Sequence, residues 1–290
     1  MNACAKIFEK AVYNVVSPHV EPLITAFQHG FRPKRSTTSN LITYTEFLCK
    51  SMTNGGQSDT LYTDFSKAFD KVPHNLLIRK LKWFGVGNTM LKWFKSYLVG
   101  RIQYVRIGNE TAKGISPSSG VPQGSILGSL LFIIFINDLP ESILSQCLMF
   151  ADDLTIFRNI NSIRDCIALQ RDLDQLHIWC VTNGLTLNVR KCSVVSFTRS
   201  ASPIIFDYQA GSTLLNRSHQ VDDLGIRFDS KLKFDHHIQM ITKKAFRSLG
   251  FIARNTKQFK NPESSILLFN TYVRSTLEYA NQVWNRMSTY

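Results

Sequence analysis

The stretch Phe150-Ala151-Asp152-Asp153 lies between two short apolar runs, at 147–149 and 154–157. The pattern predicts a strand, a tight turn and a second strand, with two acidic residues at the turn. Adjacent carboxylates repel each other, and a divalent cation can stabilise them because hard cations take oxygen ligands. A solvated Asp-Asp turn is the simpler interpretation, since aspartate favours turns. Residues elsewhere in the chain decide between the two.

Composition indicates a folded protein with a polyanionic partner. Of the 290 residues, 44% are hydrophobic and 19% charged, which is ordinary for a globular chain of one large domain or two. The formal net charge is +13, and residues 231–290 hold 10 Lys+Arg against 3 Asp+Glu. Such a basic end favours nucleic acid as the partner, with a surface charged for solubility as the alternative.

Cysteine spacing and the start of the chain bear on the compartment. The six cysteines are scattered, without the close pairs of a zinc site, which indicates a reducing compartment and no disulfide framework. No signal-peptide pattern is present at the start, and the most apolar run, 126–136, is too short to cross a bilayer. We therefore expect an intracellular protein, not secreted and without a membrane partner. Nucleus or cytoplasm, and the oligomeric state, stay open.

Hydrophobic periodicity predicts the elements along the chain. The expected helices are 3–16, ended by Pro18, then 37–50, 74–84, 88–98, 126–137, 163–183, 236–254 and 262–284. The expected strands are 61–65, with alternating burial, then 103–107, 185–188, 193–197, 204–208 and 224–228. Alternating strands and helices suit a mixed sheet covered by helices. Such a sheet can place Asp64 beside Asp152 and Asp153, and three carboxylates at strand ends suit two-metal phosphoryl transfer.

Six stretches, in order, resemble motifs of one enzyme family. They are 28–32 with 35–37, 62–72, 120–125, 150–153, 184–191 and 224–226. Together they resemble the reverse transcriptase of non-LTR (LINE-class, Jockey-like) retrotransposons, over nearly the whole chain. Each motif alone is weak, but their order is specific.

The resemblance implies an α+β fold, a right-hand polymerase with a mixed-sheet palm covered by helices, partial fingers and a helical thumb. It assigns 1–58 to the partial fingers, 59–215 to the palm, and 216–290 to the primer-grip hairpin and basic thumb. The implied activity is RNA-directed DNA polymerisation by two-metal nucleotidyl transfer. Its implied partners are an RNA template, a DNA primer and deoxynucleoside triphosphates.

The resemblance also implies roles for the acidic residues and for one lysine. Asp64 and Asp152 would bridge two Mg²⁺ ions, with Mn²⁺ as a substitute, and Asp153 would be the auxiliary acid. The carbonyl of Phe65 would be a further ligand. Lys191 would be the general acid for pyrophosphate, with a solvated surface lysine as the alternative.

Other residues are implied to bind nucleotide or duplex. Phe69 would pack under the incoming sugar and exclude a 2′-hydroxyl, or be an ordinary core residue. Gln123 and Gly124 would flank the nascent base pair, and Gly124 also suits a helix N-terminal turn. Arg32 would contact template or triphosphate, or form a structural ion pair. The duplex-binding residues would be Leu224 and Gly225 of the primer grip, with Lys243, Lys244 and Arg247 of the thumb; a solvated helix face is the alternative for the last three.

The sequence departs from the family pattern at its start. Met1 comes just after the place where relatives carry an Arg-Pro stretch that holds the triphosphate. We therefore expect an N-terminally truncated chain with little processive synthesis by itself. Two alternatives stay open: a catalytically impaired nucleic-acid-binding fragment, and an RNA-templated RNA polymerase. Phe69 argues against the second, because RNA synthesis must accept the 2′-hydroxyl.

Overall fold

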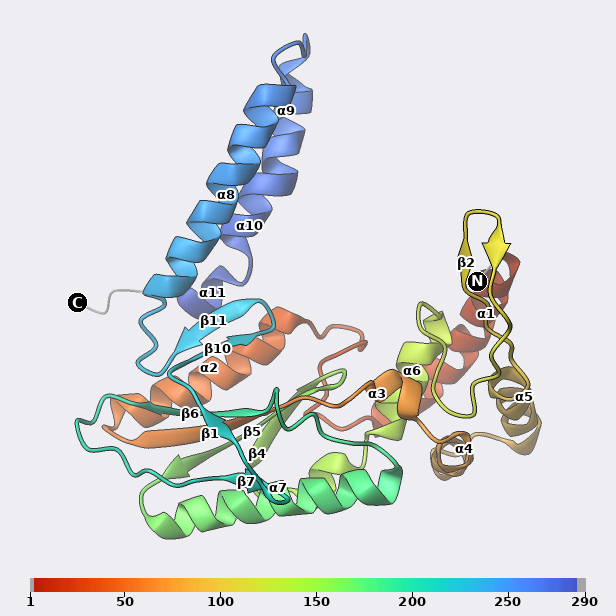
Figure 1. Ribbon diagram of the computed structural model, residues 1–290, viewed down its shortest axis with the longest axis horizontal. Coiled ribbons are helices and arrows are strands. Elements are labelled where there is room, and N and C mark those ends of the chain that lie inside the picture. The colour runs from red at the N-terminus through yellow and green to blue at the C-terminus, as the bar shows by residue number, and fades with distance from the viewer. Residues whose placement is uncertain (1–2, 286–290) are drawn as a thin grey trace. The chain divides into compact units, whose positions relative to one another are not determined.

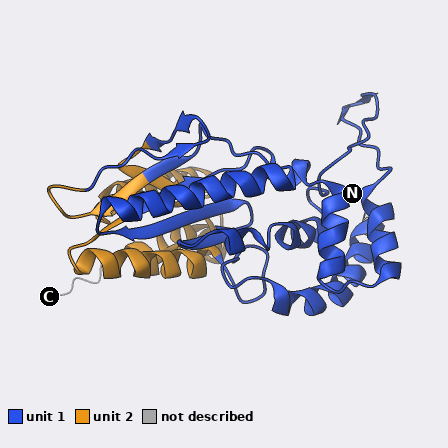
Figure 2. Cartoon of the chain, turned by 90° about the horizontal axis from the view of Figure 1, so that it is seen from below, with its two compact units in different colours: residues 1–36, 59–194, 204–216 blue, residues 37–58, 195–203, 217–290 orange. Residues whose placement is uncertain are grey.

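The computed structural model describes residues 3–285. The chain forms two compact units, and neither is one continuous stretch of sequence (Figure 2). Unit 1 comprises residues 1–36, 59–194 and 204–216, and unit 2 comprises residues 37–58, 195–203 and 217–290. The helix expected within the partial fingers therefore groups with the C-terminal part of the chain.

Unit 1 contains a helical cluster built on one apolar helix, α6. Eight of the ten residues of α6 are buried, and Ser125 caps it by accepting a hydrogen bond from the Gly128 amide. Helices α1 and α4 pack against α6 (Figure 1). The helices and 3₁₀ turns of this unit are α1 Ala3–Val20, η1 Glu21–Leu23, α3 Ala68–Lys71, α4 His74–Trp83, α5 Asn88–Leu98, α6 Ile126–Phe135, η2 Leu139–Ser142 and α7 Ile163–Asn183.

A five-stranded sheet carries the acidic turn. Its strand order is β4-β5-β1-β6-β9, with β4 Gln146–Phe150, β5 Asp153–Ile160, β1 Gln57–Thr63, β6 Ser193–Thr198 and β9 Asn216–Arg217. Strands β4 and β5 are antiparallel and pair Phe150 with Asp153, so the predicted hairpin is confirmed. Helix α7 packs against β5 (Figure 1) and ends at Gly184, whose φ of 71° suits a helix C-terminus.

Several strand predictions were wrong. The strand expected at 61–65 is present as the end of β1, but the expected alternation is absent. All seven residues of β1 are buried, because β1 lies between β5 and β6 in the sheet. The segment 185–188 forms only an isolated bridge between Leu187 and Phe65, and 204–208 forms no strand. Within 103–107, Arg106–Ile107 forms β2 and pairs with β3 Glu110–Thr111, while Gln103 makes an isolated bridge with Ile115. A short hairpin joins β7 Gln209–Ala210 to β8 Thr213–Leu214. Strand propensity favours extended backbone, but a ladder also needs a partner strand.

Unit 2 packs a helix against a hairpin and adds a helical pair. The ring of Tyr44 on α2 meets Phe197 and Phe228 edge-on. Helix α8 runs beside the segment from α9 to α10 (Figure 1). The elements are α2 Thr37–Thr53, β10 Gln220–Asp223, β11 Ile226–Asp229, α8 Asp235–Asn255, α9 Pro262–Phe269, a π-helical turn Asn270–Arg274, α10 Ser275–Glu278 and α11 Asn281–Trp284.

Two helix ends differ from expectation. Pro18 does not stop α1, which continues to Val20, because proline in the last turn removes only one hydrogen bond while Val16 and Val20 stay buried. The predicted helix 262–284 is interrupted at Tyr279 and Ala280, where Ala280 has a φ of 47°. The Tyr279 hydroxyl bonds Leu224 O at 2.8 Å and Thr37 Oγ1 at 2.9 Å, which anchors the break. None of the helices within 3–285 combines the length and the apolarity needed to cross a bilayer.

Candidate active site

Asp64 is held at the end of β1 by the segment that follows α7. The Asn188 amide donates to Asp64 O at 2.7 Å, and the Ser66 amide donates to Thr186 O at 2.8 Å. The same segment carries Lys191, whose Nζ lies 3.6 Å from Asp64 Oδ2. The backbone contacts therefore fix Asp64 and bring an ammonium group to its carboxylate.

The acidic turn, Ala151 to Asp153, lies near enough to Asp64 for their charges to interact. Burial and the Asp64 carboxylate raise the pKa of Asp152 above its ordinary value. Loss of hydration, together with the charges of Asp152 and Asp64, raises the pKa of Asp153 to about 6. The fold thus brings Asp64 near the adjacent acids Asp152 and Asp153, which follow it by 88 and 89 positions in the sequence. A cation would stabilise this cluster of like charges.

The donor set fits magnesium only with help from a substrate. As the side chains stand, no three acidic, imidazole or thiol groups within the described part of the chain converge on one point. Mg²⁺ commonly takes one or two carboxylates, several waters and substrate phosphates. Asp64 and Asp152 would supply such a pair of carboxylates, and the charge of Asp64 contributes to the raised pKa of Asp152. The role of the Phe65 carbonyl as a further metal ligand stays a prediction.

The predicted nucleotide loop is fastened to the turn that carries Phe69. The Gly120 amide donates to Val72 O and the Val121 amide to Phe69 O, both at 2.8 Å. Gln123 Nε2 donates to Asp70 Oδ1 at 2.8 Å. Phe69 and Gln123 are thereby placed on neighbouring backbone.

Two glycines of this loop have positive φ, but only one is in close contact. A Cβ on Gly120, where φ is +94°, would lie 2.7 Å from Asp70 O, whereas none of the described atoms lies within 4 Å of a Cβ at Gly124. Gly124, with a φ of 72°, precedes the Ser125 cap of α6. The helix-start interpretation of Gly124 therefore holds, and the open space leaves room for a ligand.

Phe69 stands between two other rings. It stacks on Phe132 of α6 with centroids 4.1 Å apart and planes at 18°, and it meets the Phe31 ring edge-on at 6.3 Å. Phe69 is half-buried, so one part of the ring packs in the core while another part faces outward. The core and sugar-packing interpretations are both compatible with this position.

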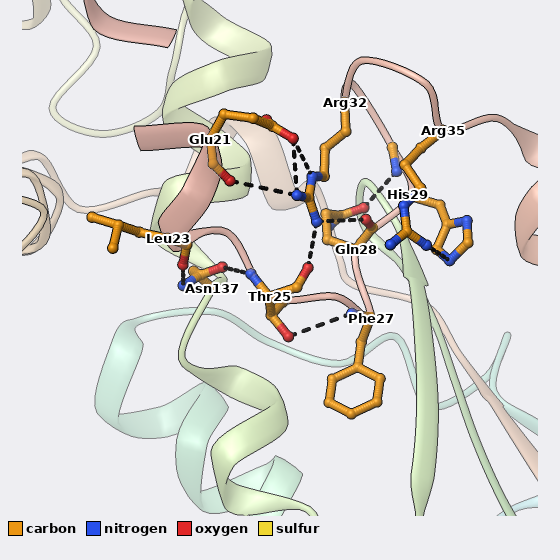
Figure 3. A network of polar contacts seen from close by, with 10 residues as sticks. Glu21, Leu23, Thr25, Phe27, Gln28, His29, Arg32, Arg35 and Asn137 are labelled. Atoms are coloured by element: carbon orange, nitrogen blue, oxygen red, sulfur yellow. Dashed lines mark hydrogen bonds and ion pairs between the residues drawn. The ribbon is translucent and has the colours of Figure 1, made fainter. Parts of the chain in front are cut away.

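Arg32 forms the structural ion pair that was one of its two interpretations. Its guanidinium contacts Glu21 Oε1 at 2.9 Å through both Nε and Nη2, and donates to Thr25 O at 2.7 Å (Figure 3). The Arg32 side chain is 11% exposed. Most of its donors are occupied within the fold, so contact with template or triphosphate stays a prediction.

The primer-grip and thumb residues lie in unit 2. Leu224 and Gly225, with φ of 43° and 84°, form the two-residue turn between β10 and β11. Lys243, Lys244 and Arg247 are exposed on α8. The hairpin and the basic face are present as expected, while their nucleic-acid contacts stay predictions.

Two residues make positioning contacts that the sequence did not indicate. Asp70 holds Gln123, and Gln28 contacts the Ala151 backbone at the acidic turn (Figure 3 shows the surroundings of Gln28). Gln28 lies in the quoted stretch 28–32, so its motif signalled importance without indicating its contact.

The sequence is similar to known proteins over most of its length. Residues 1–253 match the family model described as reverse transcriptase (RNA-dependent DNA polymerase). The RNA-directed DNA polymerase from the mobile element jockey of Drosophila funebris is 29% identical, with 96% of this chain and 32% of that protein covered. The corresponding protein from jockey of Drosophila melanogaster is 30% identical, with 84% of this chain and 27% of that protein covered. The chain thus spans about a third of the length of these relatives.

Solved structures show the same fold. A telomerase from Candida tropicalis in complex with a fragment of telomeric RNA superposes with a TM-score of 0.55 at 11% identity, covering 93% of this chain and 46% of that one. The apo telomerase of the same organism gives a TM-score of 0.56 at 13% identity, covering 94% of this chain and 50% of that one. The chain therefore has the right-hand polymerase fold.

Proposed function

The chain belongs to the reverse transcriptase (RNA-dependent DNA polymerase) family, and from this premise we propose that it carries the polymerase core of a non-LTR retrotransposon. The proposed reaction is RNA-directed DNA synthesis, in which a primer 3′-hydroxyl attacks the α-phosphate of a deoxynucleotide and pyrophosphate leaves. The observation that carries the proposal is the nearness of Asp64 to the acidic turn, since the charge of Asp64 contributes to the raised pKa of both Asp152 and Asp153.

The acids and the nearby lysine supply complementary charges. Asp64 and Asp152 would hold two Mg²⁺ ions, with Asp153 beside them, the Phe65 carbonyl as a further ligand and Mn²⁺ as a substitute. Bound metal neutralises the charge that develops on the transferring phosphate. Lys191, whose Nζ lies 3.6 Å from Asp64 Oδ2, would be the general acid for the leaving pyrophosphate.

The nucleotide would lie between the Phe69 turn and the Gln123 loop. The outward part of the Phe69 ring would pack under the sugar, and Gln123 and Gly124 would approach the nascent base pair. Gly124 has no Cβ and open space around it, so a ligand could approach its backbone closely. Arg32 would act indirectly, by fixing the segment 21–28 through its ion pair with Glu21.

RNA template and DNA primer are the proposed partners. The primer strand would be guided by the Leu224-Gly225 turn, and the duplex backbone by Lys243, Lys244 and Arg247. In domain terms, we assign partial fingers to 1–58, palm to 59–215 and thumb with primer grip to 216–290.

Primer extension tests the proposal. A labelled DNA primer on an RNA template, with Mg²⁺ and one deoxynucleotide, reports single additions and does not require processive synthesis. We expect Mg²⁺-dependent addition by the 290-residue chain. The Asp152→Asn variant should lose it, because the bridging carboxylate charge is gone.

Asp207→Asn is the matched control, since it removes one exposed acid outside the cluster. It should retain addition. Undiminished addition by Asp152→Asn, or addition without divalent metal, would refute the two-metal assignment. Equal use of ribonucleotides by the unaltered chain would favour an RNA-templated RNA polymerase instead.

A further inference from the structure

The segment 27–30 lies along the edge of the sheet next to the acidic turn. Strand β4 is the outer strand in the sheet order. The Met149 amide donates to Phe27 O at 2.9 Å, and the His29 amide donates to Met149 O at 2.8 Å, as in a parallel bridge. The segment therefore covers the end of β4 where the chain enters the turn.

The Gln28 side chain reaches from this segment to the turn itself. Gln28 is 1% exposed. Its Oε1 accepts from the Ala151 amide at 3.0 Å and from the Gly30 amide at 2.7 Å, while Nε2 donates to Ala151 O at 3.4 Å. One side chain thus holds both backbone polar groups of Ala151.

Ala151 needs such support because of its conformation. It is the first residue of the two-residue turn between Phe150 and Asp153, and its φ is 57°. Glycine takes positive φ without steric cost, whereas alanine persists there only when its surroundings hold it. The direction of Asp152 and Asp153 depends on this backbone, since they follow Ala151 directly.

Gly30 permits the contact. A Cβ at Gly30 would lie 2.3 Å from Ala151 N and 3.0 Å from Phe150 C, a distance that backbone atoms cannot accept. The segment therefore touches the turn backbone directly as well as through Gln28. Gln28 and Gly30, both in the stretch 28–32, therefore contact the backbone of the acidic turn.

We propose that Gln28 is a positioning residue that holds Ala151 in its left-handed conformation and so directs Asp152 and Asp153 toward Asp64. The metal-binding role of Asp152 and Asp153 rests on the proposed function, whereas the contact between Gln28 and Ala151 does not depend on it. Gln28 need not touch substrate or metal for this role.

The Gln28→Met variant tests the proposal, because methionine fills similar space without donor or acceptor. Amide hydrogen exchange over residues 146–157 and titration with Mn²⁺ alone, followed by electron paramagnetic resonance, are the readouts. We expect faster exchange at Ala151 and Mn²⁺ affinity weakened by about 10- to 100-fold, as for groups that orient metal ligands. Tyr208→Phe is the control: it removes a buried hydrogen bond to Asp59 elsewhere in unit 1 and should change neither readout.

A second variant separates positioning from space filling. Ala151→Gly added to Gln28→Met should restore much of the Mn²⁺ affinity, because glycine no longer needs the support. Unchanged exchange and affinity in Gln28→Met would overturn the proposal, as would a failure of Ala151→Gly to restore affinity. If the unaltered chain and Asp152→Asn bind Mn²⁺ equally, the metal assignment fails, while exchange at Ala151 still reports on Gln28.

Discussion

The ring of Phe69 stacks on that of Phe132, with centroids 4.1 Å apart and planes inclined by 18°. This stacking fixes the height of the Phe69 ring above α6. A nucleotide sugar resting on the ring would meet a rigid surface, and its 2′-position would be sterically restricted.

Phe69→Ala should therefore relax sugar selection. We expect the ratio of ribonucleotide to deoxynucleotide incorporation efficiency to rise by about tenfold or more, since packing contacts discriminate by roughly that amount. Single-nucleotide addition kinetics with both substrates measures the ratio. Phe132→Leu keeps Phe69 but loosens its support, and should give a smaller rise. An unchanged ratio in Phe69→Ala would remove the sugar-packing role and leave a core residue.

Asp70→Ala should raise the KM for deoxynucleotide more than it lowers kcat. The carboxylate anchors Gln123 at 2.8 Å, and both side chains are exposed, so the bond should contribute no more than the lower end of the range of about 1.5–3 kcal/mol for hydrogen bonds to charged groups. An effect of roughly tenfold is therefore expected. Steady-state kinetics over a range of nucleotide concentrations checks the division between KM and kcat. Asp70→Asn keeps Oδ1 as an acceptor and should stay close to the unaltered chain. A matching defect in Asp70→Asn would point to the charge rather than the anchoring bond.

His29 should make stability fall in mildly acidic solution. Burial, then the charges of Arg35 and Arg32, lower its pKa from 6.5 to about 4. Arg35 Nη1 lies 3.0 Å from His29 Nε2, and because arginine can only donate, the imidazole must be neutral. The unfolded chain then binds the proton between pH 6.5 and 4 while the folded chain does not. Stability present above pH 6.5 is therefore lost as the pH falls, by at most about 3 kcal/mol.

Urea unfolding at pH 7 and pH 4.5 measures that loss. His29→Gln should be less sensitive to the change of pH, because the titrating group is gone. His236→Gln, on the exposed side of α8, should keep the full difference. Equal pH sensitivity in His29→Gln would assign the acid lability to other groups.

The sequence predicted elements whose signals are local. Helix 88–98 was confirmed, as was 163–183, whose end is marked by Gly184. The acidic hairpin was also confirmed, because its apolar runs and turn residues are adjacent in the chain. Each of these elements is specified by residues within about 20 positions.

Contacts between distant segments could not be predicted in the same way. Gln28 and Ala151 are separated by 123 positions, and neither periodicity nor residue type indicates that they meet. The segment 185–188 has good strand residues but makes only an isolated bridge, with Phe65. The helix break at Ala280 depends on the Tyr279 hydroxyl reaching Leu224 and Thr37. Motif order indicated which acids belong together, but only the tertiary structure shows what positions them.

Arg32→Lys should destabilise the fold rather than weaken nucleotide binding specifically. Lysine cannot reproduce the guanidinium contacts with Glu21 and Thr25, and a half-buried Glu21 would lose its partner. We expect the free energy of unfolding to fall by about 2 kcal/mol. Arg274→Lys, in an exposed pair with Glu278, should cost much less, because solvent screens that pair. A higher nucleotide KM with unchanged stability would instead support direct contact with the triphosphate.

The basic face of α8 should determine how binding depends on salt. Lys243, Lys244 and Arg247 are exposed on this helix, and each phosphate neutralised contributes a slope of about −0.9 in log affinity against log salt for B-DNA. Replacing all three by alanine should reduce the slope by up to about 2.7, and weaken binding of an RNA–DNA duplex without changing sequence preference. Fluorescence anisotropy across salt concentrations gives the slope. Replacing Lys82, Lys92 and Lys95, exposed on α4 and α5, removes the same charge and should leave the slope nearly unchanged. If both triple variants lower the slope equally, overall charge accounts for the binding; if neither does, α8 presents a merely solvated face.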